Sequence, residues 1–244
     1  MRLLSILALT FIFSSIVLLT MGQSGSLYLT HFKGPKWKDD KNWSIVQDQR
    51  NNMIFANRKG IIVYSGNEKN YVKTPSMPYL LKKDTTTNTI YVACKRHFGY
   101  LQLTPKGVYQ YQGIYKADGK EDFTKILISD STIYFMGNES IYRINRQNKK
   151  INHNWETGAN KPFTGLFKNP EHIFINVWNK GLYRLESDTL FPVVSGFWTK
   201  KDQIIFSIKY DNKNVLIGTQ DNELYLFNGY KFYRYKPESY KYLK

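Results

Sequence analysis

Cationic, amide and aromatic side chains gather in short polar turns that recur along the sequence. Cations attract carboxylate or sulfate groups, and an arginine can hold such a group through two parallel hydrogen bonds. Turns of this composition suit a carbohydrate or another small molecule that carries anionic groups, although exposed polar turns without any ligand have the same composition. The candidate ligand-binding residues are Arg58, Lys59, Arg96, His97, Asn138, Trp178, Asn179 and Gln220.

No known arrangement of nucleophile, base or metal ligand accompanies these turns. The patterns His-Glu-x-x-His, Gly-x-Ser-x-Gly and Gly-x-x-x-x-Gly-Lys do not occur in the sequence. The four histidines share no register, whereas a metal site needs several converging ligands. Adjacent acids such as Glu121-Asp122 lie in polar connectors and carry no acid–base geometry by themselves. We therefore expect no catalytic residue, no metal and no cofactor, and a protein that is not an enzyme.

The polar turns belong to a unit that recurs about every 40 residues. Each unit has a short apolar strand, a polar turn and an aromatic or aliphatic strand, as in "MIFANRKGIIVYSG" at 53–66. A period of 20–50 residues is the signature of repeat architectures, and four antiparallel strands need about 40 residues. The expected fold is all-β, a β-propeller of about five four-stranded blades. The second strands of the units begin 39 to 42 residues apart, at Ile61, Tyr100, Ile141, Leu182 and Leu224.

Two further strands complete each unit. An upstream strand ends in a turn that starts with Asp or Asn, whose side chain can bond to backbone groups just ahead. These turn residues are Asp48, Asp84, Asp130, Asn169 and Asp211. A weaker fourth strand follows each unit, with prolines nearby that suit an edge strand. Within a propeller region of 42–244, the blades are expected at 42–76, 77–118, 119–158, 159–198 and 199–240.

Residues 1–22 have the features of a secretory signal peptide. Arg2 precedes an apolar core that ends in small residues. The competing interpretation is an uncleaved membrane anchor, because the apolar run approaches spanning length. A lead-in at 23–41 then precedes the blades. The mature chain is expected in the periplasm or outside the cell, with membrane contact only through an uncleaved leader or a missing C-terminal part.

The net charge of +16 is spread along the whole chain. A basic surface can attract nucleic acid, anionic lipid or anionic glycan, or it can serve solubility alone. The C-terminal "YKFYRYKPESYKYLK" interleaves tyrosine with cations, a pattern that can stack bases and neutralise phosphates. Export argues against that role, so we expect no nucleic-acid partner. The single cysteine, Cys94, alternates with apolar neighbours and is expected to be buried.

The units resemble blades of the two-component regulator propeller family. The segment "VLIGTQDNELYLFNG" at 215–229 has that family's hydrophobic strand, Gly-Thr, polar turn, Leu-Tyr strand and terminal Asn-Gly. "NKGLYRLESD" at 179–188 and the opening Asn42-Trp43 are also similar to the family, and the likeness covers most of 40–235. Gly-Thr is intact only at 218–219, and Ser140 and Glu223 stand where the family has glycine.

The resemblance implies an extracytoplasmic sensor, the N-terminal part of a bacterial signal-transduction protein or transcription regulator. Ligand binding to a complete sensor would shift a two-state receptor. Family propellers usually have more than five blades and continue into further domains, so an incomplete propeller is expected. Its partner would be the remainder of a sensor or a second copy. A stand-alone secreted binding or scaffold propeller, and a propeller enzyme acting on glycans or lactones, are the alternatives.

Overall fold

The computed structural model describes residues 41–66, 68–157, 161–193 and 203–237. Every regular element of these residues is a β-strand, and the strands form five four-stranded antiparallel sheets. The expected all-β class with five four-stranded units is therefore confirmed. The leader at 1–22 and the lead-in up to residue 40 lie outside the described residues. Among the described residues, no helix is long and apolar enough to span a membrane.

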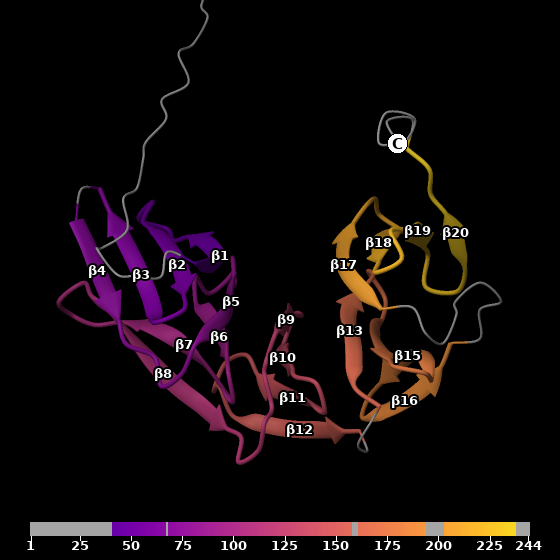
Figure 1. The fold of residues 1–244 in the computed structure, drawn as a ribbon, viewed down its shortest axis with the longest axis horizontal. Helices are drawn as coiled ribbons and strands as arrows, with labels where there is room; N and C mark the ends of the chain where they lie inside the picture. Colours follow the sequence, from indigo (N-terminus) through magenta and orange to yellow (C-terminus); the bar gives the residue numbers. More distant parts are fainter. Residues whose placement is uncertain (1–40, 67, 158–160, 194–202, 238–244) are drawn as a thin grey trace, which may run out of the picture. The chain divides into compact units, whose positions relative to one another are not determined.

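The five sheets follow the sequence, and we number them 1 to 5 (Figure 1). Sheet 1 contains β1 (Asn42–Gln47), β2 (Met53–Asn57), β3 (Gly60–Ser65) and β4 (Glu68–Val72). Sheet 2 contains β5 (Pro78–Lys83), β6 (Ile90–Cys94), β7 (His97–Leu103) and β8 (Tyr109–Lys116). Sheet 3 contains β9 (Lys125–Ile128), β10 (Thr132–Met136), β11 (Ser140–Asn145) and β12 (Ile151–Glu156). Sheet 4 contains β13 (Phe163–Lys168), β14 (Ile173–Val177), β15 (Gly181–Glu186) and β16 (Thr189–Pro192). Sheet 5 contains β17 (Ile204–Lys209), β18 (Val215–Thr219), β19 (Leu224–Phe227) and β20 (Phe232–Arg234).

The turn between the first and second strands of a sheet is closed by its Asp or Asn side chain. Asp48 accepts hydrogen bonds from the backbone N–H groups of Arg50 and Asn52, both at 2.8 Å. Equivalent bonds to backbone amides are made by Asp84, Asn169 and Asp211. The expected turn-forming role is thus confirmed at these four positions, for the reason given by Asx-turn chemistry.

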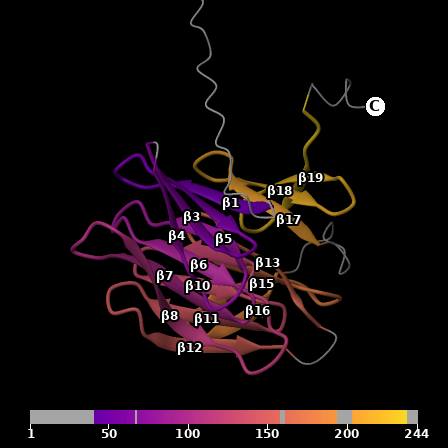
Figure 2. The same cartoon turned by 60° about the vertical axis from the view of Figure 1, so that its left-hand side comes forward.

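Consecutive sheets pack face to face, and four apolar clusters fill the spaces between them. The first strands also lie against one another in order, β1 on β5, β5 on β9, β9 on β13 and β13 on β17. The stacking of β1–β4 on β5–β8 can be followed from a second direction in Figure 2. We call the side of a sheet that faces the next sheet its forward face, and the opposite side its back face.

The contact between sheets 2 and 3 is the most aromatic of the four. The ring of Phe98 on the forward face of sheet 2 stacks on Phe135 of sheet 3 with centroids 4.2 Å apart. Phe123 meets Phe98 edge-on at 4.9 Å, and the hydroxyl groups of Tyr142 and Tyr115 are 2.6 Å apart. Strands rich in aromatic residues therefore give sheets 2 and 3 apolar faces, and the stacking of these two sheets buries the faces that meet.

Candidate functional site

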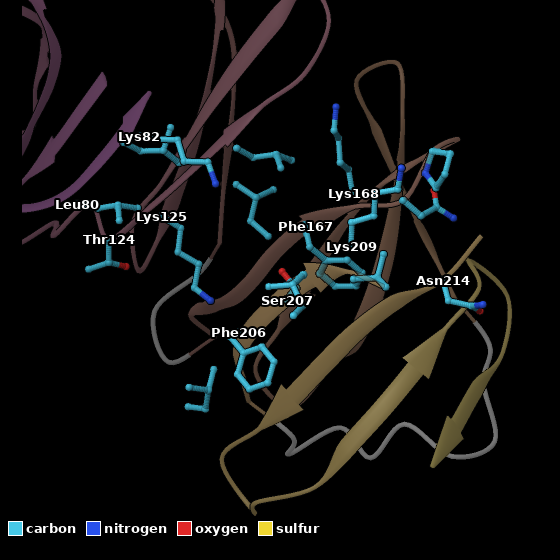
Figure 3. A pocket seen from close by; sticks show the side chains of 18 residues that line it. Leu80, Lys82, Thr124, Lys125, Phe167, Lys168, Phe206, Ser207, Lys209 and Asn214 are labelled. Atoms are coloured by element: carbon cyan, nitrogen blue, oxygen red, sulfur yellow. The ribbon is translucent and has the colours of Figure 1, made fainter. Parts of the chain in front are cut away.

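A cavity of about 630 Å³ lies along the first strands of sheets 2 to 5. Its walls come from β5, β9, β13 and β17 and from the turns that follow β13 and β17. The four strands lie in consecutive contact, so each sheet contributes side chains to one shared space. Figure 3 shows Lys82 and Lys125 on one side of this space, and Phe167, Lys168 and Lys209 on the other.

Each of the four strands places one lysine in the cavity wall, and none of the wall residues that the structure describes is acidic. The lysines are Lys82, Lys125, Lys168 and Lys209. Within the described part of the chain, none of these four ammonium groups pairs with a carboxylate. Cations gathered in a concave site focus the potential and raise the local concentration of anions. The cavity is therefore built to attract negative charge.

Lys125 is the most enclosed of the four lysines. Its Nζ donates a hydrogen bond of 3.1 Å to the carbonyl oxygen of Ile204, which starts β17. Burial lowers the pKa of Lys125, because an apolar environment disfavours the charged form. The bond joins sheet 3 to sheet 5 across the cavity. It occupies one of the three donors of the ammonium group and leaves the others for a ligand.

The wall between the lysines is apolar, with hydroxyl and amide groups among the side chains. Leu80, Phe167 and Phe206 supply the apolar part, and Ser207 is among the polar groups. The ring of Phe206 lies close to Gly218, where an added Cβ would come within 2.2 Å of the ring. The absence of a side chain at Gly218 therefore allows the Phe206 ring to pack against sheet 5, to which both residues belong. A wall of this kind can cover the apolar face of a ring while cations hold its acidic groups.

The sequence-predicted ligand residues all lie at the turns between the second and third strands of their sheets. The backbone N–H of Arg58 donates to the carbonyl of Lys41, that of Trp178 to Pro162, and that of Gln220 to Gln203. Each acceptor directly precedes the first strand of its sheet, so the turns occupy the same end of every sheet. Arg96 and Asn179 adopt left-handed φ values of 59° and 58° there.

None of these predicted residues lines the cavity, and their ligand role stays a prediction. His97 is held locally, with Nδ1 at 3.2 Å from the Ser76 hydroxyl and 3.1 Å from the Lys95 carbonyl. The sequence did not single out the cavity lysines, because they lie inside first strands and not in the polar turns whose composition suggested a site. A signal was present, since "PYLLKKD", "FTKILISD", "FTGLFKN" and "IIFSIKYD" each carry lysine within a first strand.

The adjacent acids Glu121 and Asp122 have structural partners. Glu121 accepts the backbone N–H of Glu139 at 3.1 Å and so closes the turn between β10 and β11. Burial raises the pKa of Glu121 against the opposing effect of these amide bonds. Asp122 accepts a hydrogen bond of 3.0 Å from the Tyr79 hydroxyl. Among the residues that the structure describes, no group of three His, Cys, Asp or Glu side chains could hold a metal ion.

Comparison with solved structures identifies the fold as a β-propeller. The chain is similar to the WD40 β-propeller domain of Doa1 with a TM-score of 0.64 and 10% identity, covering 84% of this chain and 70% of that one. It is also similar to YCF48 bound to D1 peptide, with a TM-score of 0.62, 9% identity and coverage of 84% and 69%. The expected propeller fold is thereby confirmed.

A third similar structure is the extracellular domain of a one component system from B. thetaiotaomicron. Its TM-score is 0.65 at 9% identity, and the match covers 85% of this chain. The chain spans 32% of the length of that domain. No profile of a known protein family matches the sequence, and no curated protein matches it. At identities of 9–10%, these similarities show the propeller fold alone. The resemblance of the sequence to sensor propellers agrees with them on the fold.

Proposed function

We propose that this β-propeller is an extracytoplasmic recognition domain that binds an acidic ligand in the lysine-lined cavity. The observation that carries the proposal is the placing of Lys82, Lys125, Lys168 and Lys209 around one space of about 630 Å³, with no acidic residue in the described part of its wall. Cavities of a few hundred cubic ångströms are the usual size for small-ligand sites. The four lysine ammonium groups would attract and hold an anion. The proposed role is therefore binding and not catalysis.

The ligand class follows from the chemistry of the wall. Lysines would hold carboxylate or sulfate groups, while Leu80 and Phe206 would cover the apolar face of a ring. Ser207 and Asn214 would bond to hydroxyl groups. A short acidic oligosaccharide combines all three features. The composition of the polar turns suggested the same class of ligand. The proposed binding site, however, lies at the first strands and not at those turns.

A sensory use of this binding is supported by one neighbour and by the resemblance of the sequence. The extracellular domain of a one component system has the same fold, and the segment 215–229 has the pattern of sensor blades. We propose that the chain is the N-terminal sensing part of a bacterial signal-transduction protein, periplasmic or secreted. The signal would arise only if the ligand binds one receptor state more tightly than the other.

Calorimetric titration with trigalacturonic acid, and with neutral maltotriose as the comparison, tests the proposal. We expect measurable binding of the acidic sugar and much weaker binding of the neutral one. Replacing Lys82, Lys168 and Lys209 together by glutamine should weaken the acidic sugar at least about tenfold, or 1.4 kcal/mol. The control replaces the exposed Lys73, Lys116 and Lys150 by glutamine, which changes the net charge equally.

The double variant Arg58→Ala, Arg96→Ala separates the cavity from the polar turns. If the cavity is the site, this variant should bind like the wild type. The proposal fails if the acidic sugar does not bind. It also fails if the cavity variant and the control variant lose the same affinity, because general charge attraction would then explain the binding.

A further inference from the structure

A second cavity, of about 290 Å³, lies between sheets 1 and 2, and the described residues of its wall include none from the lysine-lined cavity. One side of it is formed by the turn after β1 and by strands β3 and β4. The other side is formed by the turn between β7 and β8 and by the start of β8. Sites for drug-sized ligands measure about 300–1,000 Å³, so this space suits a smaller molecule.

Arg50 is held in place in the wall of this cavity. Its Nη1 donates a hydrogen bond of 3.0 Å to the carbonyl oxygen of Gly107, and its Nε lies 3.5 Å from a carboxylate oxygen of Asp48. The guanidinium also lies over the ring of Tyr109, whose hydroxyl donates to that same oxygen of Asp48 at 2.8 Å. A guanidinium has five N–H donors, so these contacts leave donors for a ligand. Because the side chain is already ordered, binding would cost less conformational entropy.

Two opposite charges line the cavity without pairing. Glu68 begins β4, and Lys106 lies in the turn between β7 and β8. Within the part of the chain that the structure describes, neither of these side chains forms an ion pair. The charge of Arg50 is already balanced by Asp48, so Lys106 and Glu68 offer one cation and one anion to a ligand. A small molecule that carries both charges would pair with both.

The rest of the wall is apolar or carries amide groups. Val63 is buried and Val108 is half-exposed, and both belong to the same wall. Asn52 is 6% exposed, and its Nδ2 donates a hydrogen bond of 2.9 Å to Asp48, which fixes the orientation of its amide. Asn70 adds a second amide. A small apolar side chain can therefore lie against the valines while polar groups bind the charged end of the same molecule.

We propose that this second cavity binds a free α-amino acid with an apolar side chain. The carboxylate of the amino acid would bind Arg50 and Lys106, and its ammonium group would bind Glu68. Its side chain would lie against Val63 and Val108. A molecule with only one of the two charges leaves Glu68 or Lys106 without a partner in the complex, so the cavity should discriminate against it.

Calorimetric titration with L-leucine and two of its analogues tests the proposal. Isocaproate is leucine without the ammonium group, and isoamylamine is leucine without the carboxylate. We expect L-leucine to bind with a dissociation constant of about 1 mM or lower, and each analogue to bind at least about tenfold more weakly. A site that recognises only the apolar side chain would bind all three molecules alike.

Two single variants assign the charges of the ligand to the wall. Glu68→Gln should weaken L-leucine and reduce its advantage over isocaproate, because only leucine has the ammonium group that Glu68 would bind. Lys106→Gln should weaken L-leucine and reduce its advantage over isoamylamine. Both side chains are exposed, so the fold should tolerate these changes. The controls Glu171→Gln and Lys150→Gln make the same changes of charge at exposed positions of other sheets and should bind L-leucine like the wild type.

Replacing Lys82, Lys168 and Lys209 together by glutamine separates this site from the lysine-lined cavity, because that variant should bind L-leucine like the wild type. The proposal is overturned if L-leucine binds more weakly than about 1 mM, or if either analogue binds as tightly as L-leucine. It is also overturned if Glu68→Gln or Lys106→Gln binds all three molecules like the wild type. Loss of L-leucine binding in the triple variant would place the amino acid in the other cavity and overturn it as well.

Discussion

The guanidinium of Arg146 donates hydrogen bonds to both carboxylate oxygens of Asp84 and so links sheet 3 to sheet 2. Its Nε donates to one carboxylate oxygen at 2.6 Å, and its Nη2 donates to the other. Nη1 donates to the carbonyl of Asp130 at 2.7 Å. Burial alone would raise the pKa of Asp84, but Arg146, the Thr87 hydroxyl and two backbone amides together hold this pKa well below its ordinary value.

The first prediction is that Arg146→Gln lowers the free energy of unfolding and reduces its dependence on acid. The lowered pKa of Asp84 stabilises the fold at pH values above the unfolded pKa of about 3.9. That contribution is lost as the pH falls through the lower folded pKa. Urea unfolding between pH 7 and pH 2 should therefore show a steeper acid loss in the wild type than in the variant.

A matched control for this prediction is Arg234→Gln. Arg234 also pairs with a carboxylate through two nitrogens, that of Glu223, but its side chain is 52% exposed. Exposed ion pairs contribute little, because water and salt screen them. Equal losses in the two variants would mean that Asp84 and Arg146 do not form a structural link between sheets.

The second prediction concerns the aromatic contact between sheets 2 and 3. Phe98 is 0% exposed and touches four other rings. Phe98→Ala should lower the free energy of unfolding by about 3–5 kcal/mol, because it leaves a cavity in a packed core. Phe191→Ala removes a ring that is 43% exposed, and it should cost much less. A similar cost for both variants, measured by urea unfolding, would contradict the close packing of Phe98 between sheets 2 and 3.

The third prediction tests the bulged pairing of β7 and β8. A Cβ added at Gly99 would lie 2.1 Å from the backbone oxygen of Gln112, which cannot move without disturbing the strand. Gly99→Ala should therefore cost about 1–3 kcal/mol of unfolding free energy. Gly119→Ala meets nothing within 4 Å and should change stability by no more than about 0.5 kcal/mol. Wild-type stability in Gly99→Ala would show that the two strands do not approach so closely.

The fold was predictable because it depends on a period that the sequence repeats. Ile61, Tyr100, Ile141, Leu182 and Leu224 all lie in the third strands of their sheets, as their spacing predicts. Asp48, Asp84 and Asn169 close their turns by a local bond that needs no knowledge of the tertiary structure. Cys94 is buried as its apolar neighbours indicate, and burial raises the pKa of its thiol to about 12.

The cavity could not be predicted in the same way. Its lysines do not repeat at one register, since Lys125 begins β9 whereas Lys168 and Lys209 end β13 and β17. The first strands of sheets 2, 4 and 5 also carry a bulge near their start, which shifts the alternation of faces. In these three strands, simple alternation from the strand start therefore assigns Lys82, Lys168 and Lys209 to the wrong face.

The fourth prediction is a pH dependence of ligand binding. Burial lowers the pKa of Lys125 below the ordinary value of a lysine, so Lys125 loses its proton at a lower pH than an ordinary lysine does. Affinity for trigalacturonic acid should begin to fall at a pH below about 10.4, the ordinary pKa of lysine. The Lys125→Gln variant should bind trigalacturonic acid more weakly at pH 7. Its affinity should not show the decrease that begins below the ordinary pKa of lysine. Identical pH profiles for the two proteins at constant salt would exclude Lys125 from the site.

The most direct test of the central claim is the crystal structure of the protein with bound trigalacturonic acid. The account predicts the sugar in the cavity, with its carboxylates within hydrogen-bond distance of Lys82, Lys168 or Lys209 and a ring face against Phe206. Density for the sugar at the polar turns around Arg58 and Arg96, with the cavity empty, would contradict it. An empty cavity at a saturating sugar concentration would contradict it as well.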